Sequence, residues 1–598
     1  MIDSEQYQLT HLRSSMKDSG IDTYIIPSAD PHLGEYIPDH WRIILWLTGF
    51  TGSSSTIVIT DSFAGIWTDS RYFIQAEEQL KGSGVTLMNP LLTENKDFTV
   101  WLKENIKEGS TIAFDGRIFS VSRLRKLEIE LQGKNILIKI DQDLISAIWN
   151  DRPELPDSMA FDHDLSFCGI SRSDKIDRVR EKMKQMEVNY HLLCAPDDIM
   201  WMLNIRGSDV RFSPLLSSFA IIGEDQVLLF ADENKIPLKI ASEFDKLNIV
   251  ILPYEETAAI LSSLPVDSSV LITPAYTSAV LFNSIPEGMT IMEDVSIPAR
   301  LKSVKNKTEI SNIEKAMIKD GIALTKFFFW LETTGYSSDL TEISISEKLN
   351  EFRSGQNNYL SPSFQTISAF NEHGALPHYT ATPATDSGIS GTGILLIDSG
   401  GQYLDGTTDI TRTVAIGRPS AQQKTDFTLV LKGMISLAMA KFPSTTRGFQ
   451  LDILARKALW EHGLNYGHGT GHGVGFCLNV HEGPLSISPG TNPDSKTVIR
   501  PGMLISDEPA IYREGEYGIR IENLILCYED EETESGQFLR FDTVSLCYID
   551  KTLIDKSLLE SKEIEWLNKY HSEVYEKLSP QLTPEEKEWL KGKISFLF

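Results

Sequence analysis

Acidic side chains stand inside or directly behind apolar, strand-like runs in the second half of this chain, and they limit how that half can fold. Asp398 follows four apolar residues, and Glu508 follows another apolar run. In residues 518–524 apolar and charged residues alternate, so we expect Arg520 and Glu522 on one face of a strand. A carboxylate at the end of a core-facing strand is costly without a partner, so these segments must fold around positive charge.

A second strand-like run follows Asp409, eleven residues after Asp398. The two runs predict a hairpin-like pair that brings both carboxylates to one spot. Like charges at one spot repel each other and raise a pKa unless a cation neutralises them. The alternative is that Asp398 and Asp405 are ordinary turn residues, because Asp is common in turns. We adopt that interpretation for Asp405 only.

Six of the 12 histidines fall between residues 373 and 481. Two of them, His468 and His472, stand in a glycine-rich loop, where glycines let backbone and ligand approach closely. The loop fails the G-x-G-x-x-G register, and no Gly-Lys-Ser/Thr follows it, so it does not match the phosphate-binding patterns. Two imidazoles in such a loop suit metal ligation or proton transfer better. The alternative is a flexible turn with incidental histidines.

Together these segments supply four carboxylates and one imidazole. The candidate set is Asp398, Asp409, His472, Glu508 and Glu522. Oxygen-rich ligation with a single nitrogen suits hard divalent ions, Mn²⁺ before Zn²⁺. Four carboxylates carry too much negative charge for one ion but suit two, which can share a hydroxide. Plainer alternatives are an ion pair between Glu522 and Arg520 and an ordinary charged strand end at Glu508.

The first 300 residues contain one internal repeat. Residues 22–30 and 46–52 follow the same order as residues 189–197 and 201–207: a strand, a proline-bearing turn, a tryptophan and a glycine-rich loop. This repetition indicates two similar domains, separated by a linker at 150–156. Helix-like and strand-like patterns alternate over the whole chain and favour a mixed α/β fold.

Length agrees with several domains. At roughly 150 residues per domain, 598 residues should form about three or four. We expect domain I at 1–150, a similar domain II at 151–300 and a third domain at 301–598, whose end from about Asp550 looks helical. The clearest strand-like runs are Thr23–Ile26, Thr56–Ile59, Val227–Phe230, Ile249–Leu252, Gly393–Ile397 and Ile519–Leu526. The clearest helix-like runs are Gln6–Met16, Asp174–Met186, Lys307–Leu331 and Gln422–Ala440.

Composition excludes several classes of function. The net charge of −27 and the pI near 4.9 argue against a general nucleic-acid binder and against a polybasic membrane anchor. No apolar run approaches the roughly 18–20 residues of a membrane span, and no secretory signal is seen. Five scattered cysteines without a C-x-x-C pair fit a reducing compartment. We therefore expect a cytoplasmic protein.

The order Asp, ten residues, Asp, His, Glu and Glu resembles the pita-bread metallopeptidases, which include methionine aminopeptidase, prolidase and aminopeptidase P. Within that group the motifs are most similar to those of cytosolic aminopeptidase P, the Xaa-Pro aminopeptidases, from about residue 5 to about residue 590. One departure is Tyr-Thr-Ala-Thr-Pro at 379–383, where the family more usually has His-Tyr-x-Pro. The matching segments are 67–73, 206–210, 396–400, 405–409, 468–475, 480–484 and 507–509.

The resemblance implies a fold and a site. The fold would be two creatinase-type N-terminal α/β domains followed by a pita-bread catalytic domain with a C-terminal helical extension. Two divalent ions, Mn²⁺ first with Zn²⁺ or Co²⁺ as alternatives, would be bound by the five candidate ligands, with Asp409 and Glu522 bridging them. Arg520 would orient Glu522 and its neighbours, and His468 would be a proton or hydrogen-bond partner outside the ligand set.

The resemblance also implies an activity: release of the N-terminal residue from peptides with proline second. The Xaa–Pro amide has no N–H, so it needs a dedicated site. Hydroxide held by two metals would attack the carbonyl. His481 would help to stabilise the oxyanion, Glu508 would take the proton of the water, and His378 would assist the leaving nitrogen. His378 and His481, with Arg71 from the first domain, would contact the substrate.

Three other functions stay open. A prolidase would cleave only dipeptides, and an inactive pita-bread domain would bind peptides or histones without cleavage. Methionine aminopeptidase is a weaker alternative, because its chains are generally much shorter and lack the paired N-terminal domains. Cytosolic relatives are usually dimers, so we expect a homodimer.

Overall fold

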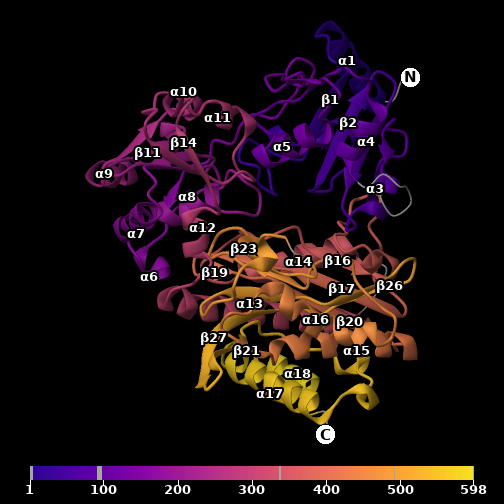
Figure 1. Cartoon of the computed structure of the whole chain (residues 1–598). Helices are drawn as coiled ribbons and strands as arrows, with labels where there is room; N and C mark the ends of the chain where they lie inside the picture. Colours follow the sequence, from indigo (N-terminus) through magenta and orange to yellow (C-terminus); the bar gives the residue numbers. More distant parts are fainter. Residues whose placement is uncertain (1–3, 90–96, 336–338, 491, 597–598) are drawn as a thin grey trace. The chain divides into compact units, whose positions relative to one another are not determined.

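The computed structural model describes residues 4–89, 97–335, 339–490 and 492–596. The chain divides into two compact units. Residues 1–163 and 170–298 form unit 1, and residues 164–169 and 299–598 form unit 2. Figure 1 draws unit 1 in indigo to magenta and most of unit 2 in orange to yellow. Among the described helices, none has both the length and the apolar character that a membrane crossing requires.

Unit 1 contains two six-stranded sheets with the same topology. Their strand orders are β4-β3-β2-β1-β5-β6 and β12-β11-β10-β8-β13-β14. In each sheet one central strand pairs antiparallel with one neighbour and parallel with the other. The strands are β1 (Thr23–Pro27), β2 (Ser55–Thr60), β3 (Ala64–Thr68), β4 (Thr86–Leu87), β5 (Thr111–Ala113), β6 (Leu137–Lys139), β8 (Tyr190–Leu193), β10 (Phe219–Ile222), β11 (Val227–Phe230), β12 (Ile249–Leu252), β13 (Ser269–Ile272) and β14 (Thr290–Glu293), beside the short pair β7 (Phe161–Asp162) and β9 (Ile205–Arg206).

Helices cover the faces of both sheets, and the central strands are therefore apolar on both sides. In β1, Tyr24 and Ile26 belong to one hydrophobic cluster and Ile25 to another, because successive side chains of a strand point to opposite faces. The helices are α1 (Ser4–Asp18), α2 (Ile43–Thr48), α3 (Phe73–Gln79), α4 (Phe98–Asn105), α5 (Val121–Glu130), α7 (Arg172–Gln185), α8 (Pro196–Leu203), α9 (Leu238–Lys246), α10 (Thr257–Ser262) and α11 (Ala279–Asn283), with α12 (Ile297–Lys302) at the boundary between the units.

Unit 2 is built on a six-stranded antiparallel sheet of order β21-β28-β27-β24-β22-β23 and a three-stranded sheet of order β16-β17-β20. Its largest hydrophobic cluster joins these strands to the helices. The strands are β15 (Tyr359–Pro362), β16 (Ile367–Phe370), β17 (Gly393–Ser399), β18 (Gly401–Tyr403), β19 (Gly406–Thr407), β20 (Ile410–Ile416), β21 (Lys441–Pro443), β22 (Gly471–Gly473), β23 (Glu482–Ile487), β24 (Leu504–Asp507), β25 (Ala510–Arg513), β26 (Tyr517–Arg520), β27 (Asn523–Thr533) and β28 (Gly536–Thr543). The helices are α6 (Leu165–Cys168), α13 (Lys307–Thr334), α14 (Glu342–Ser354), α15 (Ala421–Ala438), α16 (Gly448–Trp460), α17 (Ser561–Leu578) and α18 (Pro584–Ile594).

The predicted mixed α/β fold with two similar N-terminal domains and a pita-bread domain is confirmed. The four helix-like runs are α1, α7, α13 and α15, and the strand-like runs in the first 400 residues are also strands. One prediction is wrong: Ile519–Leu526 is not a single strand, since β26 ends at Arg520 and β27 begins at Asn523. The break has a physical cause, because the amide of Glu522 donates to the carbonyl of Thr411 in β20 instead of extending a ladder.

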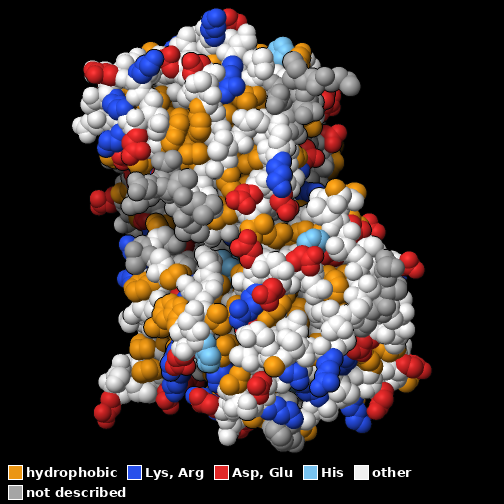
Figure 2. All heavy atoms as spheres, turned by 90° about the vertical axis from the view of Figure 1, so that its right-hand side faces the viewer, with side chains coloured by type: hydrophobic (Ala, Val, Ile, Leu, Met, Phe, Trp, Pro, Cys, Tyr) orange, Lys and Arg blue, Asp and Glu red, His pale blue; other side chains and the backbone are white. Residues whose placement is uncertain are grey.

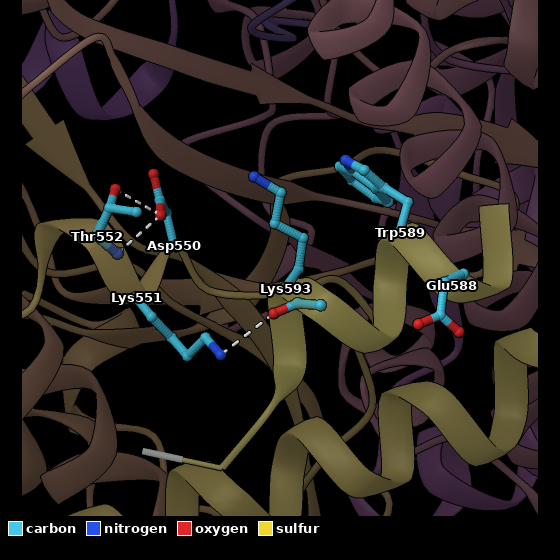
Figure 3. Close-up of a pocket in the computed structure, with 7 residues that line it drawn as sticks. Asp550, Lys551, Thr552, Glu588, Trp589 and Lys593 are labelled. Atoms are coloured by element: carbon cyan, nitrogen blue, oxygen red, sulfur yellow. Dashed lines mark hydrogen bonds between the residues drawn. The ribbon is translucent and has the colours of Figure 1, made fainter. Parts of the chain in front are cut away.

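Charged side chains are spread over the surface that Figure 2 draws, where acidic groups alternate with basic ones. All five cysteines are buried thiols. A shallow cavity of about 420 Å³ lies beside α18 (Figure 3). Lys551 reaches toward the end of this helix, where it donates to the carbonyl of Ser595 at 2.6 Å. The cavity thus marks where the C-terminal helix is tied to the rest of unit 2.

The buried imidazole of His571 on α17 makes the stability of the protein depend on pH. Its Nε2 accepts from the amide of Ile549 at 3.1 Å, so the proton sits on Nδ1, which has no hydrogen-bond partner among the described residues. Burial, with the nearby charges of Lys551 and Arg412, lowers the pKa of His571 to about 3. The neutral form therefore stabilises the fold above the unfolded pKa of about 6.5, and this contribution is lost as the pH falls toward 3.

We expect His571 to remove about 2 kcal/mol from the free energy of unfolding between pH 7 and pH 5. Urea unfolding of the native chain and of His571→Gln, each at both pH values, measures this contribution. Glutamine keeps an acceptor for Ile549 but does not titrate. The variant should therefore lose less stability than the native chain on acidification, and equal losses in the two proteins would show that His571 is not the cause.

Candidate metal centre

The two aspartates meet as the predicted hairpin-like pair requires. β17 and β20 are antiparallel, with Asp398 opposite Thr411. Asp409 stands directly before β20, so its side chain projects from the same end of this sheet. Both carboxylates are buried, with relative exposures of 8% for Asp398 and 5% for Asp409. Asp405, which we interpreted as a turn residue, lies in the turn between β18 and β19 and pairs with Lys319 at 2.6 Å.

The other three candidates come from neighbouring strands of the six-stranded sheet. His472 lies in β22, Glu508 follows β24, and Glu522 precedes β27. β24 pairs antiparallel with both β22 and β27, and in the latter pair Asp507 stands opposite Asn523. Because of this pairing, the end of β24, the start of β27 and the middle of β22 lie side by side, which brings Glu508, Glu522 and His472 close together.

The glycines around His472 have a structural reason. A side chain at Gly471 would meet the carbonyl oxygen of Ser506, and one at Gly473 would meet that of Glu482. Glycine thus lets β22 approach both neighbouring strands closely. In this position the amide of His472 donates to the hydroxyl of Ser506 at 3.0 Å, and that hydroxyl donates to Oε1 of Glu508 at 3.1 Å.

Hydrogen bonds fix which nitrogen of His472 faces the carboxylates. Nδ1 lies 2.9 Å from the carbonyl oxygen of Gly473, which can only accept, so Nδ1 carries a proton. Nε2 lies 3.5 Å from Oδ2 of Asp409 and 3.5 Å from Oε1 of Glu508. Nε2 is therefore the atom that can ligate a metal ion, and the carbonyl of Gly473 orients the ring for it.

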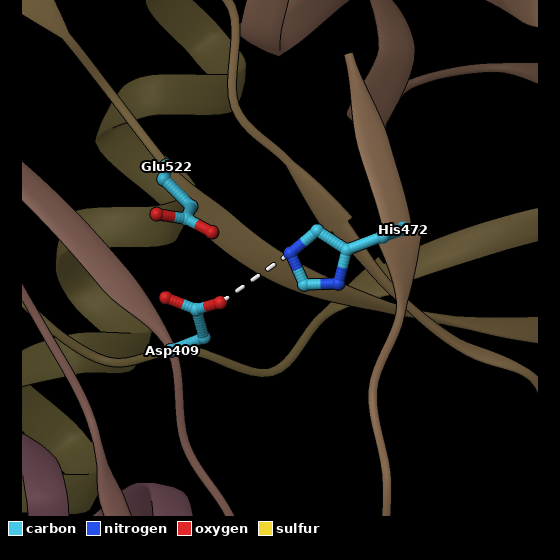
Figure 4. Close-up of side chains that lie close together, drawn as sticks. All are labelled: Asp409, His472 and Glu522. Atoms are coloured by element: carbon cyan, nitrogen blue, oxygen red, sulfur yellow. Dashed lines mark ion pairs between the residues drawn. The ribbon is translucent and has the colours of Figure 1, made fainter. Parts of the chain in front are cut away.

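Three of the five candidates form one compact group. Asp409, His472 and Glu522 each offer a ligand atom, and these atoms lie within 4.8 Å of one another (Figure 4). Glu508 joins them through its contact with His472. Thr411 orients the carboxylate of Glu522, because its hydroxyl donates to Oε2 of that residue at 2.7 Å.

Asp398 meets a fixed positive charge. Arg520 donates from NH2 to Oδ2 of Asp398 at 2.6 Å, whereas Oδ1 is buried without a hydrogen-bond partner among the described residues. Arg520 reaches Glu522 only through Thr411, whose hydroxyl accepts from its Nε at 3.1 Å. The structure pairs Arg520 with Asp398, so the plainer alternative of a direct ion pair between Arg520 and Glu522 does not hold.

The electrostatics of the centre are those of an uncompensated acidic cluster. Burial raises the pKa of Asp398 and of Glu508, although Arg520 acts in the opposite direction on both. Burial, together with the charges of Asp409 and Asp398, raises the pKa of Glu522 well above its usual value. For His472 burial works to lower the pKa, but the hydrogen bond to Asp409 and the charge of Glu508 outweigh it and raise the pKa to about 9.

The donor set fits divalent cations. Three buried carboxylates and the half-buried Glu508 face one arginine and one imidazole, and Oδ1 of Asp398 has no hydrogen-bond donor among the described residues. Carboxylate oxygens with a single imidazole nitrogen are ligands that Mn²⁺ and similar ions accept. Two such ions would supply the positive charge that these carboxylates lack. The convergence of the five groups is therefore chemically sensible for a dinuclear site.

A hydrogen-bonded chain runs from Arg520 to the glycine-rich loop. Arg520 donates from NH1 to the hydroxyl of Tyr512 at 2.6 Å. Nδ1 of His468 donates to the carbonyl of Gly469 at 2.7 Å, so its Nε2 accepts from Tyr512, at 2.9 Å. Nδ1 of His468 also lies 4.0 Å from Oε2 of Glu508. His468 thus stands beside the ligand set without belonging to it.

The remaining predicted site residues lie at different places. The ring of His481 packs edge-on against His472, with ring centroids 4.4 Å apart. His378 is half-buried and lies in the segment of the chain that connects the short helix at Asn371–Ala375 to β17. Arg71 belongs to unit 1, where its guanidinium bonds to Asp69 at 2.8 Å. The roles of these three residues toward a substrate stay predictions.

Sequence reasoning missed several residues that shape the centre: Thr411, Ser506 and Tyr512. Thr411 had a weak signal, because it is two residues after Asp409 and so falls on the same side of the β20 segment. Ser506 and Tyr512 had none, since a lone hydroxyl near a strand end has many ordinary uses.

Models of known protein families match nearly the whole chain. The description Metallopeptidase family M24 matches residues 311–529, and C-terminal region of peptidase M24 matches 537–597. Creatinase/Prolidase N-terminal domain matches twice, at 8–147 and at 151–309.

Full-length relatives agree. The Xaa-Pro aminopeptidase ApepP of Drosophila melanogaster is 38% identical over 98% of this chain and 97% of its own length. The crystal structure of an X-prolyl aminopeptidase from Caenorhabditis elegans, described as a cytosolic enzyme with a di-nuclear active site, superposes with a TM-score of 0.94 at 34% identity and covers 100% of both chains. A prolidase from Pyrococcus horikoshii OT3, at 23% identity and a TM-score of 0.50, covers 63% of this chain and 99% of its own, and shares the fold. The chain therefore belongs to metallopeptidase family M24, together with the full-length Xaa-Pro aminopeptidases that it matches.

Proposed function

We propose that the protein is an Xaa-Pro aminopeptidase, a metal-dependent hydrolase that releases the first residue of peptides with proline second. The observation that carries the proposal is the cluster of Asp409, His472 and Glu522 within 4.8 Å, in a chain whose full-length relatives bear that name. The full-length match favours this activity over that of a prolidase, because the prolidase structure accounts for only 63% of the chain.

The structure suggests which residues would hold the metals. Asp398, Asp409, His472, Glu508 and Glu522 would hold two divalent cations. We propose Mn²⁺ as the resident ion, because the set is rich in oxygen and has a single nitrogen. The chemistry that the two cations supply is to acidify a water molecule and to polarise the scissile carbonyl.

The side chains of the site supply positioning and proton transfer. Ser506 donates to Oε1 of Glu508 and leaves Oε2 to take a proton from the attacking water. The raised pKa of Glu508, which burial causes, suits a general base near neutral pH. Arg520 and Tyr512 hold His468 through two successive hydrogen bonds, so that its ring stays beside Glu508.

Two histidines would act on the substrate. His481 lies against His472 and would donate to the oxygen of the scissile carbonyl as negative charge develops there. His378 would assist the proline nitrogen as it leaves, and Arg71 would contact the peptide. The tertiary amide of an Xaa–Pro bond has no hydrogen to donate, which is why the leaving nitrogen needs such a partner.

Further properties belong to the same proposal. We propose that the enzyme acts in the cytoplasm as a homodimer, and the relative described as cytosolic supports the location. We also propose domain boundaries near residues 150 and 300 and an origin of the first two domains by duplication. The shared strand order and pairing of the two sheets in unit 1 support the duplication.

Parallel assays of a tripeptide and a dipeptide test the proposed activity. With Mn²⁺ present we expect the purified protein to release arginine from Arg-Pro-Pro and to cleave Gly-Pro much more slowly. A chelator should stop the reaction, and added Mn²⁺ should restore it. Cleavage of Gly-Pro alone would identify a prolidase. Binding of Arg-Pro-Pro without cleavage at any metal concentration would instead identify a peptide-binding module.

A further inference from the structure

The backbone at Glu522 is held by an arginine that the mechanism does not use. Arg412 lies in β20 and is buried, with a relative exposure of 2%. Its NH1 donates to the carbonyl oxygen of Glu522 at 2.7 Å, and its NH2 donates to Oδ1 of Asn523 at 2.8 Å. These two bonds fix the chain at the break between β26 and β27. These bonds therefore fix the position of the Glu522 backbone, from which its carboxylate projects toward the acidic centre.

The neighbouring residue of β20 fixes the other end of the same side chain. Thr411 donates its hydroxyl to Oε2 of Glu522 at 2.7 Å. Successive residues of a strand point to opposite faces, so Thr411 faces the acidic centre while Arg412 faces away from it. Two neighbouring residues of β20 thus hold Glu522: Thr411 bonds to its carboxylate on one face of the strand, and Arg412 bonds to its backbone carbonyl on the other.

The face on which Arg412 lies is covered by the C-terminal region. Its Nε donates to the carbonyl of Tyr548 at 3.0 Å, and its NH2 also contacts the carbonyl of Cys547 at 2.9 Å. The same NH2 donates to the hydroxyl of Tyr570 on α17 at 2.8 Å. Every nitrogen of the guanidinium is therefore engaged.

Tyr570 closes this network through one oxygen atom. Its hydroxyl accepts from the amide of Cys547 at 3.2 Å and lies 3.0 Å from the carbonyl of Ser545, to which it can donate. The side chain is 4% exposed. Because the hydroxyl joins three separate segments in a buried place, its loss would leave polar groups without partners and let the guanidinium of Arg412 shift.

We propose that Tyr570 is a positioning residue of the metal centre, acting through Arg412 on the backbone of Glu522. The C-terminal helix α17 then contributes to cation binding although it carries none of the ligands. The inference rests on the part of the proposed function that places divalent cations at the centre. It does not depend on which peptide is cleaved.

Calorimetric titration of the metal-free full-length protein with Mn²⁺ tests this role. Tyr570→Phe removes one oxygen and keeps the ring. We expect its Mn²⁺ affinity to fall by about tenfold or more, since partners of ligands typically contribute factors of about 10–100. Excess Mn²⁺ should restore most of the lost turnover. The melting temperature of the metal-free variant should change by only about 4 °C.

Tyr575→Phe is the matched control. Tyr575 lies on the same helix and is half-buried, and its hydroxyl makes no hydrogen bond among the described residues. We expect wild-type affinity for this variant. Arg412→Lys keeps a positive charge but loses the planar fork of donors, so it should weaken Mn²⁺ binding more than Tyr570→Phe does.

The outcomes separate the two proposals. If Tyr570→Phe binds Mn²⁺ as tightly as Tyr575→Phe, or only melts earlier with unchanged affinity, the positioning role is refuted and α17 merely packs. If the wild-type protein binds no Mn²⁺, the proposed function fails as well. If Mn²⁺ binding weakens as expected while Arg-Pro-Pro is not cleaved, only the proposed activity fails.

Discussion

Replacing Asp409 with Asn is expected to prevent binding of the cation pair and to lower kcat/KM by more than about a hundredfold, because loss of residues that merely support ligands already costs factors of about 10–100. The asparagine would keep the size of the side chain but lose its charge, and Nε2 of His472 would lose one of its two carboxylate neighbours. His472→Ala should have a similar effect, because it removes the nitrogen ligand of the set.

The melting temperature of the metal-free variant distinguishes a loss of metal binding from a loss of folding. The charge of Asp409 raises the pKa of Glu522, so removing it relieves repulsion inside the cluster. Metal-free Asp409→Asn should therefore melt no lower than metal-free wild type. Saturating Mn²⁺ should raise the melting temperature of the wild type and leave that of the variant unchanged.

Glu514→Gln is the control for a change of charge alone. Glu514 is exposed in the turn between β25 and β26, within the same part of the sequence. The Glu514→Gln protein should keep the metal content and the turnover of the wild type. Full activity and two bound ions in Asp409→Asn would refute its place in the centre.

The second large effect is expected at Arg456, which clamps the glycine-rich loop from α16. Its Nε donates to Oδ2 of Asp452 at 2.7 Å, its NH1 donates to the carbonyl of Tyr466 at 2.8 Å, and its NH2 to that of His468 at 2.6 Å. The side chains of both charged partners are nearly inaccessible, at 2% and 3%. Arg456 thus ties the loop that carries two of the candidate histidines to the buried face of α16.

Arg456→Met should lower the free energy of unfolding by about 3–5 kcal/mol, because it leaves Asp452 charged, buried and without its cation. Turnover should fall as well, since the loop loses the donors that hold its carbonyl groups. Urea unfolding and steady-state kinetics measure the two effects. Stability within about 0.5 kcal/mol of wild type would contradict this account of the clamp.

A double replacement separates the charge from the clamp. Asp452→Leu combined with Arg456→Met removes both charges, so it should recover part of the lost stability. It should not recover turnover, because the carbonyls of Tyr466 and His468 still lack their donors. Lys457→Met, at the exposed next position of α16, should change neither property by much.

The sequence allowed the cluster to be predicted because its candidate ligands are tied to local patterns. Asp398 lies at the end of the apolar strand β17, Asp409 directly precedes β20, and His472 stands among glycines that a close approach of strands explains. Each pattern is short and visible without knowledge of the fold. The convergence of the groups then follows from the need to compensate buried negative charge.

What the sequence could not predict are contacts between distant segments. Alternation suggested one continuous strand through Glu522, but the amide of Glu522 bonds to Thr411 and the ladder breaks there. Arg520 pairs with Asp398, which is 122 positions away, rather than with its neighbour Glu522. The bond between Arg412 and Tyr570 spans 158 positions. Such pairs depend on how whole elements pack, and no local spacing records them.

Diffraction from crystals grown with Mn²⁺, measured at the manganese absorption edge, tests the central claim most directly. We predict two anomalous peaks roughly 3.5–4 Å apart. Both should lie among the carboxylates of Asp398, Asp409, Glu508 and Glu522, with Nε2 of His472 bound to one of them. A single peak, or peaks that these five side chains do not touch, would contradict the account.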